Sequence, residues 1–394
     1  MERPPAQSYE ELEELRELVK VGKLFQVQEW MQAGKPIYCS AKSKKRSVLE
    51  IAARSGFYSM VELLAKEHPD RDTLNSALTG ALKERHPEIA MLLVQQGADV
   101  DHPCIEDIVE CYDPRLMRFV LGRIDISKDD ALARAIRERA RPLVGVFKEY
   151  GRKPGGDAQL AKALQYFVEE KDDHWVSLTL WMGADPRLRV TSMRRSCDRS
   201  GDEEDDSKMS ALEVAYLFAE PRIVKQFKLD LSVDDPNSLM ARMFFPNAEV
   251  IEHLLAKGAK INDKPGGGSL LIDRYLSNIA SDRQHGFGSE RYISDDDVRM
   301  LIARGARFAP ENTEEYKAAR SAILGRSIFG KDLLKLLAYA AEPAVIRKLL
   351  DTPNMRQAFG GKPDDVMKRL RINFGETEQR SNTSSQRGGN RSRS

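Results

Sequence analysis

The sequence has few aromatic residues, few cysteines and no long apolar run. Aromatic residues make up 7% of its 394 residues, and there are four cysteines. Four cysteines are too few to hold a chain of this length in a disulfide framework, so we expect reduced thiols. No apolar run approaches the roughly 18 residues that span a bilayer, and no signal-peptide core follows Met1. These absences favour a cytoplasmic protein, or a nuclear one in a eukaryote, without membrane association.

The sequence also has no large excess of positive or negative charge. Lys and Arg number 62 against 61 Asp and Glu, which gives a formal net charge of +1. This balance excludes a globally basic nucleic-acid binder. The hydrophobic content of 41% is ample for folding. The length exceeds the usual limit of about 250 residues for one compact core, so the chain needs two domains or an extended repeat array.

A pattern of apolar residues at helical spacing recurs along the chain and often ends in Gly-Ala. The glycine-equivalent positions are 34, 68, 97, 124, 151, 183, 231, 258, 305 and 353. A helix pair with its turns needs about 30 residues, so the shorter steps hold one pair each and the longer steps hold insertions. The pattern predicts an all-α solenoid of about ten stacked antiparallel helix pairs over residues 8–353.

Prolines and a cap signal support the helix pairs. Pro87, Pro114, Pro221 and Pro343 each lie ten positions before the glycine-equivalent residue of their unit. Proline fits the first turn of a helix, where its missing N–H would have no partner, so each is expected to begin a second helix. At the N-terminus, Ser8-Tyr9-Glu10-Glu11 resembles a capping box.

These residues resemble ankyrin repeats. The segments that begin at Ser47 and Ser210 resemble the family's helix start, while Gly97-Ala98-Asp99, Gly183-Ala184-Asp185 and Gly258-Ala259-Lys260 resemble its closing turn. Only the unit around 47–68 matches both halves well. The units around 104–151 keep the helix pattern but lose the loop signature, so a looser helical solenoid is the alternative. The resemblance implies a non-enzymatic protein-binding scaffold.

Two insertions and a tail interrupt this pattern. The insertion at 186–208 holds several arginines and then an acidic block, and it lies between units. The insertion at 280–293 falls inside a helix pair. After an extension at 354–374, residues 375–394 are rich in Ser, Arg, Gly and Asn, and we expect them to be disordered.

Candidate partner-binding residues lie in the first insertion and among the aromatics. Most aromatics, including Trp30, Trp175 and Phe119, fall on the apolar side of second helices and are expected in the core. Trp181 falls on a variable position, and Phe244-Phe245 precedes Pro246, so these three are candidate interface anchors. The candidate set is Arg187, Arg189, Arg194, Arg195, Asp202, Glu203, Glu204, Trp181, Phe244 and Phe245.

Motifs for catalysis, cofactors or metals are weak. Residues 325–331 nearly spell a phosphate-binding loop, but Asp332 stands where the Mg²⁺-binding Ser or Thr belongs. His102, Cys104 and Cys111 lack the tight spacing of a zinc site, so buried structural cysteines are the preferred interpretation. We therefore expect no catalytic residue, no cofactor and no metal.

Two functions follow from the sequence. The first is a protein–protein interaction scaffold or adaptor with unidentified protein partners. The alternative is an RNA- or DNA-associated adaptor that uses the Arg-rich insertion and the tail.

Overall fold

A computed structural model describes residues 5–39, 45–67, 70–193, 208–244, 246–264, 270–272, 300–301, 303–306, 351 and 362–369. The predicted insertion at 280–293, the tail at 375–394, Pro343 and the loop at 325–331 lie outside these residues. The chain divides into two units, Met1–Ala211 and Leu212–Ser394. The predicted bounds of the solenoid, 8–353, stay a prediction.

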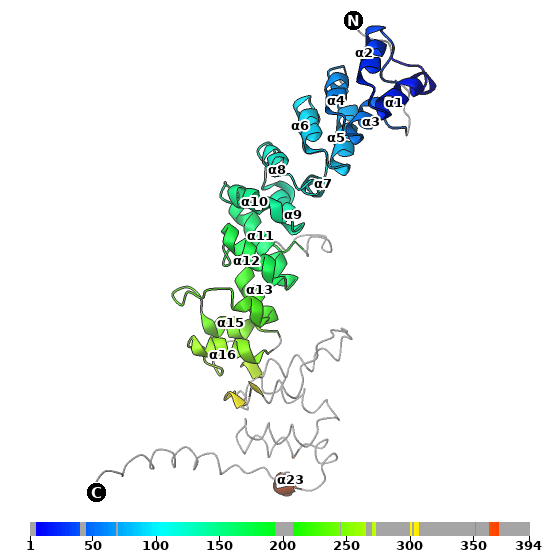
Figure 1. Ribbon diagram of the computed structural model, residues 1–394. Helices are drawn as coiled ribbons and strands as arrows, with labels where there is room; N and C mark the ends of the chain where they lie inside the picture. The colour runs from blue at the N-terminus through cyan, green and yellow to red at the C-terminus, as the bar shows by residue number, and fades with distance from the viewer. Residues whose placement is uncertain are drawn as a thin grey trace, which may run out of the picture. The chain divides into compact units, whose positions relative to one another are not determined.

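The first unit is a run of helix pairs, labelled in Figure 1. The pairs are α1 (Glu13–Lys20) with α2 (Leu24–Gln32), α3 (Val48–Arg54) with α4 (Tyr58–Ala65), α5 (Arg71–Lys83) with α6 (Pro87–Gln95), α7 (Ile105–Val109) with α8 (Pro114–Leu121), α9 (Ala131–Arg137) with α10 (Val144–Gly151), and α11 (Gly156–Glu169) with α12 (Asp173–Met182). Short 3-10 turns, η1 (Glu10–Leu12), η2 (Lys128–Asp130) and η3 (Arg141–Leu143), precede α1, α9 and α10.

The helices of this unit form two columns. First helices pack on first helices from α1 through α3, α5, α7 and α9 to α11, and second helices pack on one another from α4 through α6, α8 and α10 to α12. The core lies between the columns. Small residues such as Ala52, Ala53 and Ala77 are fully buried there and let neighbouring first helices approach closely. The chain is an all-α solenoid of stacked antiparallel helix pairs, as the repeat pattern predicted.

The turns inside the six pairs of the first unit share one backbone form. One residue with a left-handed backbone stands in each turn, directly before the N-cap of the second helix or, between α9 and α10, directly before that of η3. These residues are Gly22, Gly56, Arg85, Tyr112, Arg139, Lys171 and, in the second unit, Ala219. Each lies twelve positions before a glycine-equivalent residue of the sequence pattern. The structural repeat therefore has the spacing that the sequence shows, insertions included.

Two of the loops that leave second helices are each held by an asparagine of the first helix of the pair. Gly97 and Gly258 have left-handed backbones, which end α6 and α16 (Ala248–Ala256). Asn75 accepts a hydrogen bond from the backbone N–H of Asp99 at 2.7 Å, and Asn237 accepts one from Lys260 N–H at 2.7 Å. The same clamp thus occurs in both units, two residues after the glycine.

The helix starts confirm most of the cap signals. Pro87, Pro114 and Pro221 each occupy the first position of a second helix. The capping box at Ser8 was wrong: Tyr9 is the N-cap of η1, and no side chain caps that turn. The Ser8 side chain instead hydrogen-bonds to the carboxylate of Glu10, and this bond helps to lower the pKa of Glu10.

The second unit continues with shorter helices. They are α13 (Ala211–Phe218), α14 (Pro221–Val224), α15 (Pro236–Arg242) and α16, and α23 (Pro363–Arg369) lies near its end. Helix α14 is only four residues long, shorter than the second helix expected to begin at Pro221. The chain turns at Lys225–Phe227, where Phe227 is buried instead of continuing the helix.

Candidate interaction surface

The outward sides of α8, α10 and α12 form one continuous surface on the second-helix column of the first unit. Each helix buries one stripe at helical spacing, for example Val146, Phe147 and Tyr150 on α10. The residues opposite the buried stripes point away from the core. We call this surface the outer face, and its members are Arg115, Arg118, Lys148, Glu149, Arg152 and Trp181.

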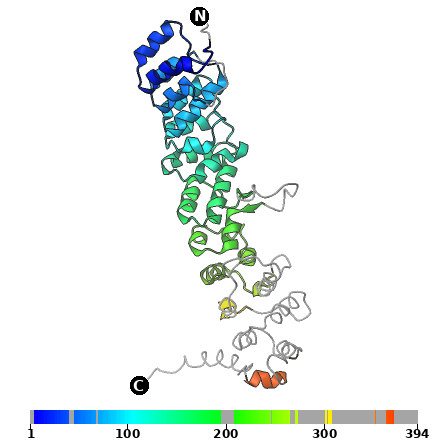
Figure 2. The ribbon, with the colours of Figure 1, turned by 90° about the vertical axis from the view of Figure 1, so that its right-hand side faces the viewer.

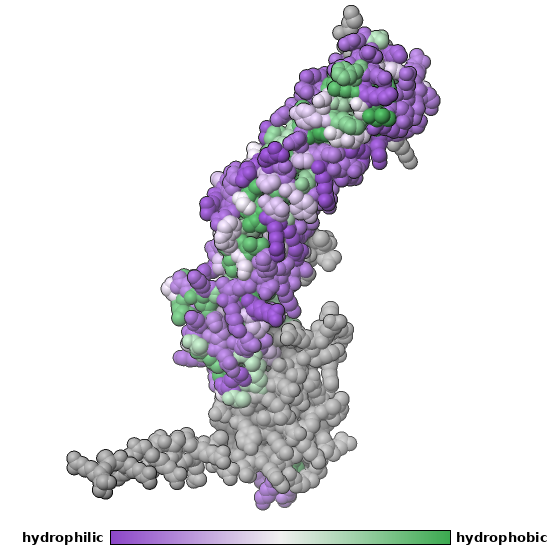
Figure 3. All heavy atoms as spheres, in the orientation of Figure 1, coloured by the Kyte–Doolittle hydropathy of each residue, from purple (hydrophilic) through white to green (hydrophobic). Residues whose placement is uncertain are grey.

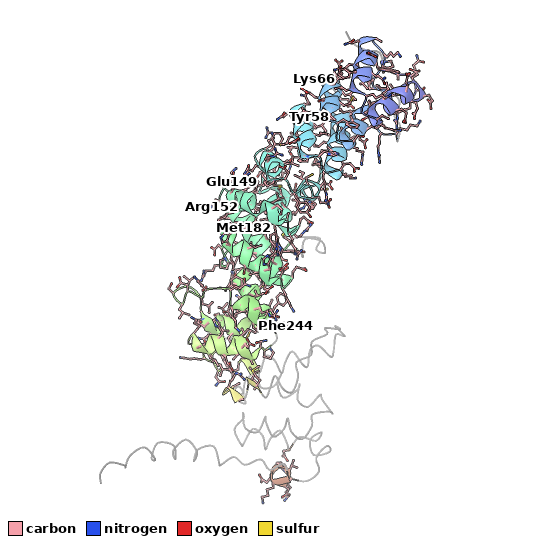
Figure 4. All side chains as sticks on the ribbon, in the orientation of Figure 1. Tyr58, Lys66, Glu149, Arg152, Met182 and Phe244 are labelled. Atoms are coloured by element: carbon pink, nitrogen blue, oxygen red, sulfur yellow. The ribbon has the colours of Figure 1, made fainter. Side chains whose placement is uncertain are left out.

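Side-chain contacts join neighbouring helices across the outer face. The guanidinium of Arg118 donates to Glu149 Oε2 at 2.9 Å and links α8 to α10. The ammonium of Lys148 lies 3.4 Å from the ring centroid of Trp181 and links α10 to α12. Glu149 and Arg152 lie along the same edge of the helical stack in Figure 4. The surface is therefore continuous across three repeats.

Trp181 is the exposed tryptophan of the chain. Its exposed fraction is 58%, against 8% for Trp30 and 4% for Trp175. The predictions of an exposed Trp181 and of a buried Trp30 and Trp175 are confirmed. A cation over an indole ring is attracted to the π face, so Lys148 restrains the orientation of Trp181. An exposed ring held in place loses little freedom when it binds a partner.

Other aromatic rings near the outer face are already covered by cations. Arg123 lies 3.6 Å from the ring centroid of Phe119, and Lys153 lies 3.4 Å from that of Tyr150. Phe119 is only half-buried, so its predicted place in the core was wrong. Its position at the edge of the buried stripe of α8 leaves one side open, and Arg123 fills that side.

Positive charge gathers around α8 and α10. Residues 113–123 and 141–153 contain seven Lys or Arg and two Asp or Glu, a local excess of five positive charges in a chain whose net charge is +1. Arg115 and Arg118 are engaged in ion pairs with acidic neighbours. In Figure 3 the surface at the level of α8 and α10 shows hydrophilic residues with hydrophobic residues among them.

A short antiparallel ribbon forms the base of the first insertion. Strand β1 (Arg189–Val190) pairs with β2 (Met209–Ser210), with Val190 opposite Met209. The ribbon stands at the edge of the stack in Figure 2. It packs on α11, and the Ser192 hydroxyl donates to Glu169 Oε2 at 3.0 Å. Both ends of the insertion are thus fixed at one point on the first-helix column.

The structure places the predicted site residues in different surroundings. Arg189 is exposed on β1 against α11, whereas Trp181 contacts α10, so the described contacts do not bring these two together. Arg187 is half-buried just before the ribbon. Phe244 is 44% exposed in the second unit, and its N–H donates to Leu217 O at 2.9 Å. Five further candidates in the insertion (Arg194, Arg195, Asp202, Glu203, Glu204) and Phe245 lie outside the described residues.

The two cysteines among the predicted metal candidates, Cys104 and Cys111, lie in different environments. Cys104 is exposed at the N-cap of α7, so the prediction that it is buried was wrong. Cys111 is half-buried, its thiol lies 3.6 Å from Leu82 O, and burial raises its pKa to about 11. Among the described residues, no cluster of three or more His, Cys, Asp or Glu is arranged to hold a metal. None of the described helices has the length and apolarity needed to cross a membrane.

Sequence reasoning missed the basic part of the outer face. The signal was present, because Lys148 and Arg152 are four residues apart on one second helix and Arg118 occupies a similar place on the previous one. Cations at helical spacing are common on solvated helices, so the pattern alone does not predict a binding surface. It indicates one only when the structure shows that three packed helices place these cations beside an exposed Trp.

Comparison with known proteins assigns no family to the chain. No protein-family model matches the sequence, and no curated protein matches it. Among solved structures, the chain is similar to the human ASB11 ankyrin repeat domain, with 15% identity over 75% of this chain and 99% of that chain and a TM-score of 0.29. A TM-score this low leaves the resemblance to ankyrin repeats a prediction.

Proposed function

We propose that this protein is a non-enzymatic scaffold or adaptor that binds other proteins through its helical repeats. The observation that carries the proposal is the exposed Trp181 held by Lys148 on a surface that runs across three stacked helix pairs. A stacked array presents side chains from successive repeats on a preformed surface, so a partner can bind without further folding of the scaffold. Exposed Trp residues are frequent anchors of such interfaces.

The proposal includes several predictions made from the sequence. The repeats belong to a divergent ankyrin type and number about ten, the protein works in the cytoplasm, and no cofactor takes part. The first insertion is a second recognition element, because its base is fixed to α11 by the β1–β2 ribbon and by the Ser192–Glu169 hydrogen bond. Its candidate contacts include Arg187 and Arg189.

The first test is affinity capture from the native cell with three forms of the full chain. One is unchanged, one carries Trp181→Ala, and one replaces residues 191–208 by Asn-Gly. Because Val190 pairs with Met209, a two-residue turn closes the ribbon and keeps β1 and β2, while the Ser192–Glu169 hydrogen bond is removed with the insertion. Phe25→Ala is the matched control, since Phe25 is 78% exposed on α2 and lies outside the outer face.

We expect a reproducible set of captured proteins that is lost in part with Trp181→Ala and in part with the shortened insertion. Phe25→Ala is expected to capture the full set. An identical set for all four forms would show that neither element recognises partners. The absence of any specifically captured protein would overturn the scaffold function itself.

A further inference from the structure

We infer that the outer face binds an acidic peptide segment of a partner protein, with Trp181 as the apolar anchor and Lys148 and Arg152 as the cations that recognise its carboxylates. The inference rests on the proposed function, because it names the chemistry of the partner. It starts from the charge of the surface, from the pairing state of each cation and from the single accessible ring.

Two cations on α10 are available for a ligand. Within the described part of the chain, Arg152 makes no ion pair or side-chain hydrogen bond, and Lys148 contacts only the Trp181 ring. By contrast, Arg118 is paired with Glu149. Lys148 and Arg152 are one helical turn apart on the same side of α10, so their charges point in one direction. Both stand within the region that carries an excess of five positive charges.

The arrangement suits discrete carboxylates better than a phosphate backbone. Glu149 lies on the same side of α10, between Lys148 and Arg152 in sequence, and its side chain is 46% exposed. Single-stranded nucleic acid is bound along a continuous positive groove, and the Arg118–Glu149 and Arg115–Glu88 ion pairs interrupt such a track on this surface. A peptide places its acidic side chains at separate points and can set a neutral residue opposite Glu149.

The aromatic residues also favour a peptide ligand over a nucleic acid. Binding of single-stranded nucleic acid without sequence preference uses several rings on which successive bases stack. Here Tyr150 is buried and Phe119 is half-buried beneath Arg123, whereas Trp181 stays 58% exposed with Lys148 over its ring, so Trp181 is the accessible ring of the outer face. One exposed Trp beside two available cations matches one apolar side chain flanked by acidic residues.

The ligand search uses a phage-displayed library of random peptides on the immobilised full-length chain. Selected peptides are synthesised with a fluorescein label, and their affinities are measured by fluorescence anisotropy at two salt concentrations. The test variant is Lys148→Glu with Arg152→Glu. The control variant, Lys35→Glu with Lys66→Glu, makes the same change in charge outside the outer face. Lys35 is a matched residue because it also lies over a tryptophan, at 4.1 Å from the centroid of the buried Trp30.

We expect the selected peptides to be acidic with at least one apolar residue. The reversal at 148 and 152 is expected to weaken their binding about tenfold or more, and the control is expected to bind like the unchanged chain. Binding is also expected to shield Trp181 from acrylamide quenching, which reports on this residue because Trp30 and Trp175 are buried. Circular dichroism confirms that each variant is folded.

Three results would overturn the inference: selected peptides without acidic bias, equal binding by both double variants, or tighter binding of a fluorescein-labelled oligo(dT) than of every selected peptide. If any of these occurs while Trp181→Ala still removes captured proteins from the cell, the outer face binds proteins of another chemistry and the proposed function stands. If, in addition, the unchanged chain captures no protein specifically, the proposed function is overturned as well.

Discussion

At the scale of single residues, the turns before seven second helices place different amino acids in the same left-handed backbone conformation. Glycine supplies the left-handed backbone at Gly22 and Gly56, while Arg, Tyr, Lys and Ala residues supply it at the other positions. A non-glycine residue in this conformation costs about 1–2 kcal/mol, so the five non-glycine turns carry strain that packing must offset. At Gly56 a second constraint applies, because the ring of His86 lies 2.8 Å from where a Cβ would be.

Gly56→Ala is therefore expected to destabilise the protein by about 1–3 kcal/mol. The added methyl group meets both the backbone strain and the His86 ring, whose Nε2 lies 3.2 Å from Arg54 O. The midpoint of urea unfolding, followed by far-ultraviolet circular dichroism, measures the change.

The matched control is Gly145→Ala. Gly145 lies within α10, and nothing is within 4 Å of an added Cβ there. The same chemical change should leave stability unaltered or raise it by up to about 1 kcal/mol. Equal urea midpoints for the two variants would show that the turn conformation places no demand on position 56.

At the scale of helices, an ion cluster joins α7 to α9. Glu106 accepts two hydrogen bonds from Arg134, at 2.9 and 2.7 Å, and a third from Arg137 at 3.2 Å. Burial by itself would raise the pKa of Glu106, but the hydrogen bond from Arg134 and the charges of both arginines outweigh it, so the pKa is lowered. The bidentate geometry and the half-buried site distinguish this pair from the exposed ion pairs of the surface.

We expect Glu106→Gln to destabilise the protein by about 1 kcal/mol at neutral pH, since it removes a charged acceptor from two arginines. A carboxyl whose pKa is lower in the folded state contributes stability above its unfolded value of 4.5, and the contribution is lost as the pH falls through the folded value. The urea midpoints of the variant and the unchanged chain should therefore converge below about pH 4.5.

Glu62→Gln is the control for this cluster. Glu62 forms an exposed pair with Lys66 on α4, and its loss should change stability by less than about 0.5 kcal/mol at any pH. A Glu106→Gln effect that is the same at pH 3 and pH 7 would contradict the electrostatic explanation.

The helices were more predictable from the sequence than the contacts between them. Pro87 and Pro114 gave correct helix starts because proline's fixed φ and missing N–H act locally. The turn residue Tyr112 gave no signal, because non-glycine residues seldom adopt a left-handed backbone and its residue type does not indicate one. The exposure of Trp181 followed from its place in the apolar pattern, whereas its contact with Lys148 joins residues of different repeats and needed the structure.

At the scale of the whole molecule, the first unit is held together by contacts between neighbouring repeats. Packing between first helices runs in sequence order, from α3 to α5, from α5 to α7, and onwards. In such an array the stability of each repeat depends on itself and its neighbours, so a local defect should spread only a short way. A globular core would instead unfold cooperatively as one body.

Phe147→Ala tests this directly. Phe147 is fully buried in α10, and its removal should cost about 3–5 kcal/mol. Hydrogen exchange followed by mass spectrometry is expected to rise in α7 through α12 and to stay unchanged in α1 through α4. The reciprocal variant, Leu49→Ala in α3, removes another fully buried side chain and should raise exchange in α1 through α6 while α11 and α12 stay protected. Uniform acceleration across all six helix pairs in either variant would show that the unit unfolds as one cooperative body, and the repeats would then not act as separable elements of a binding surface.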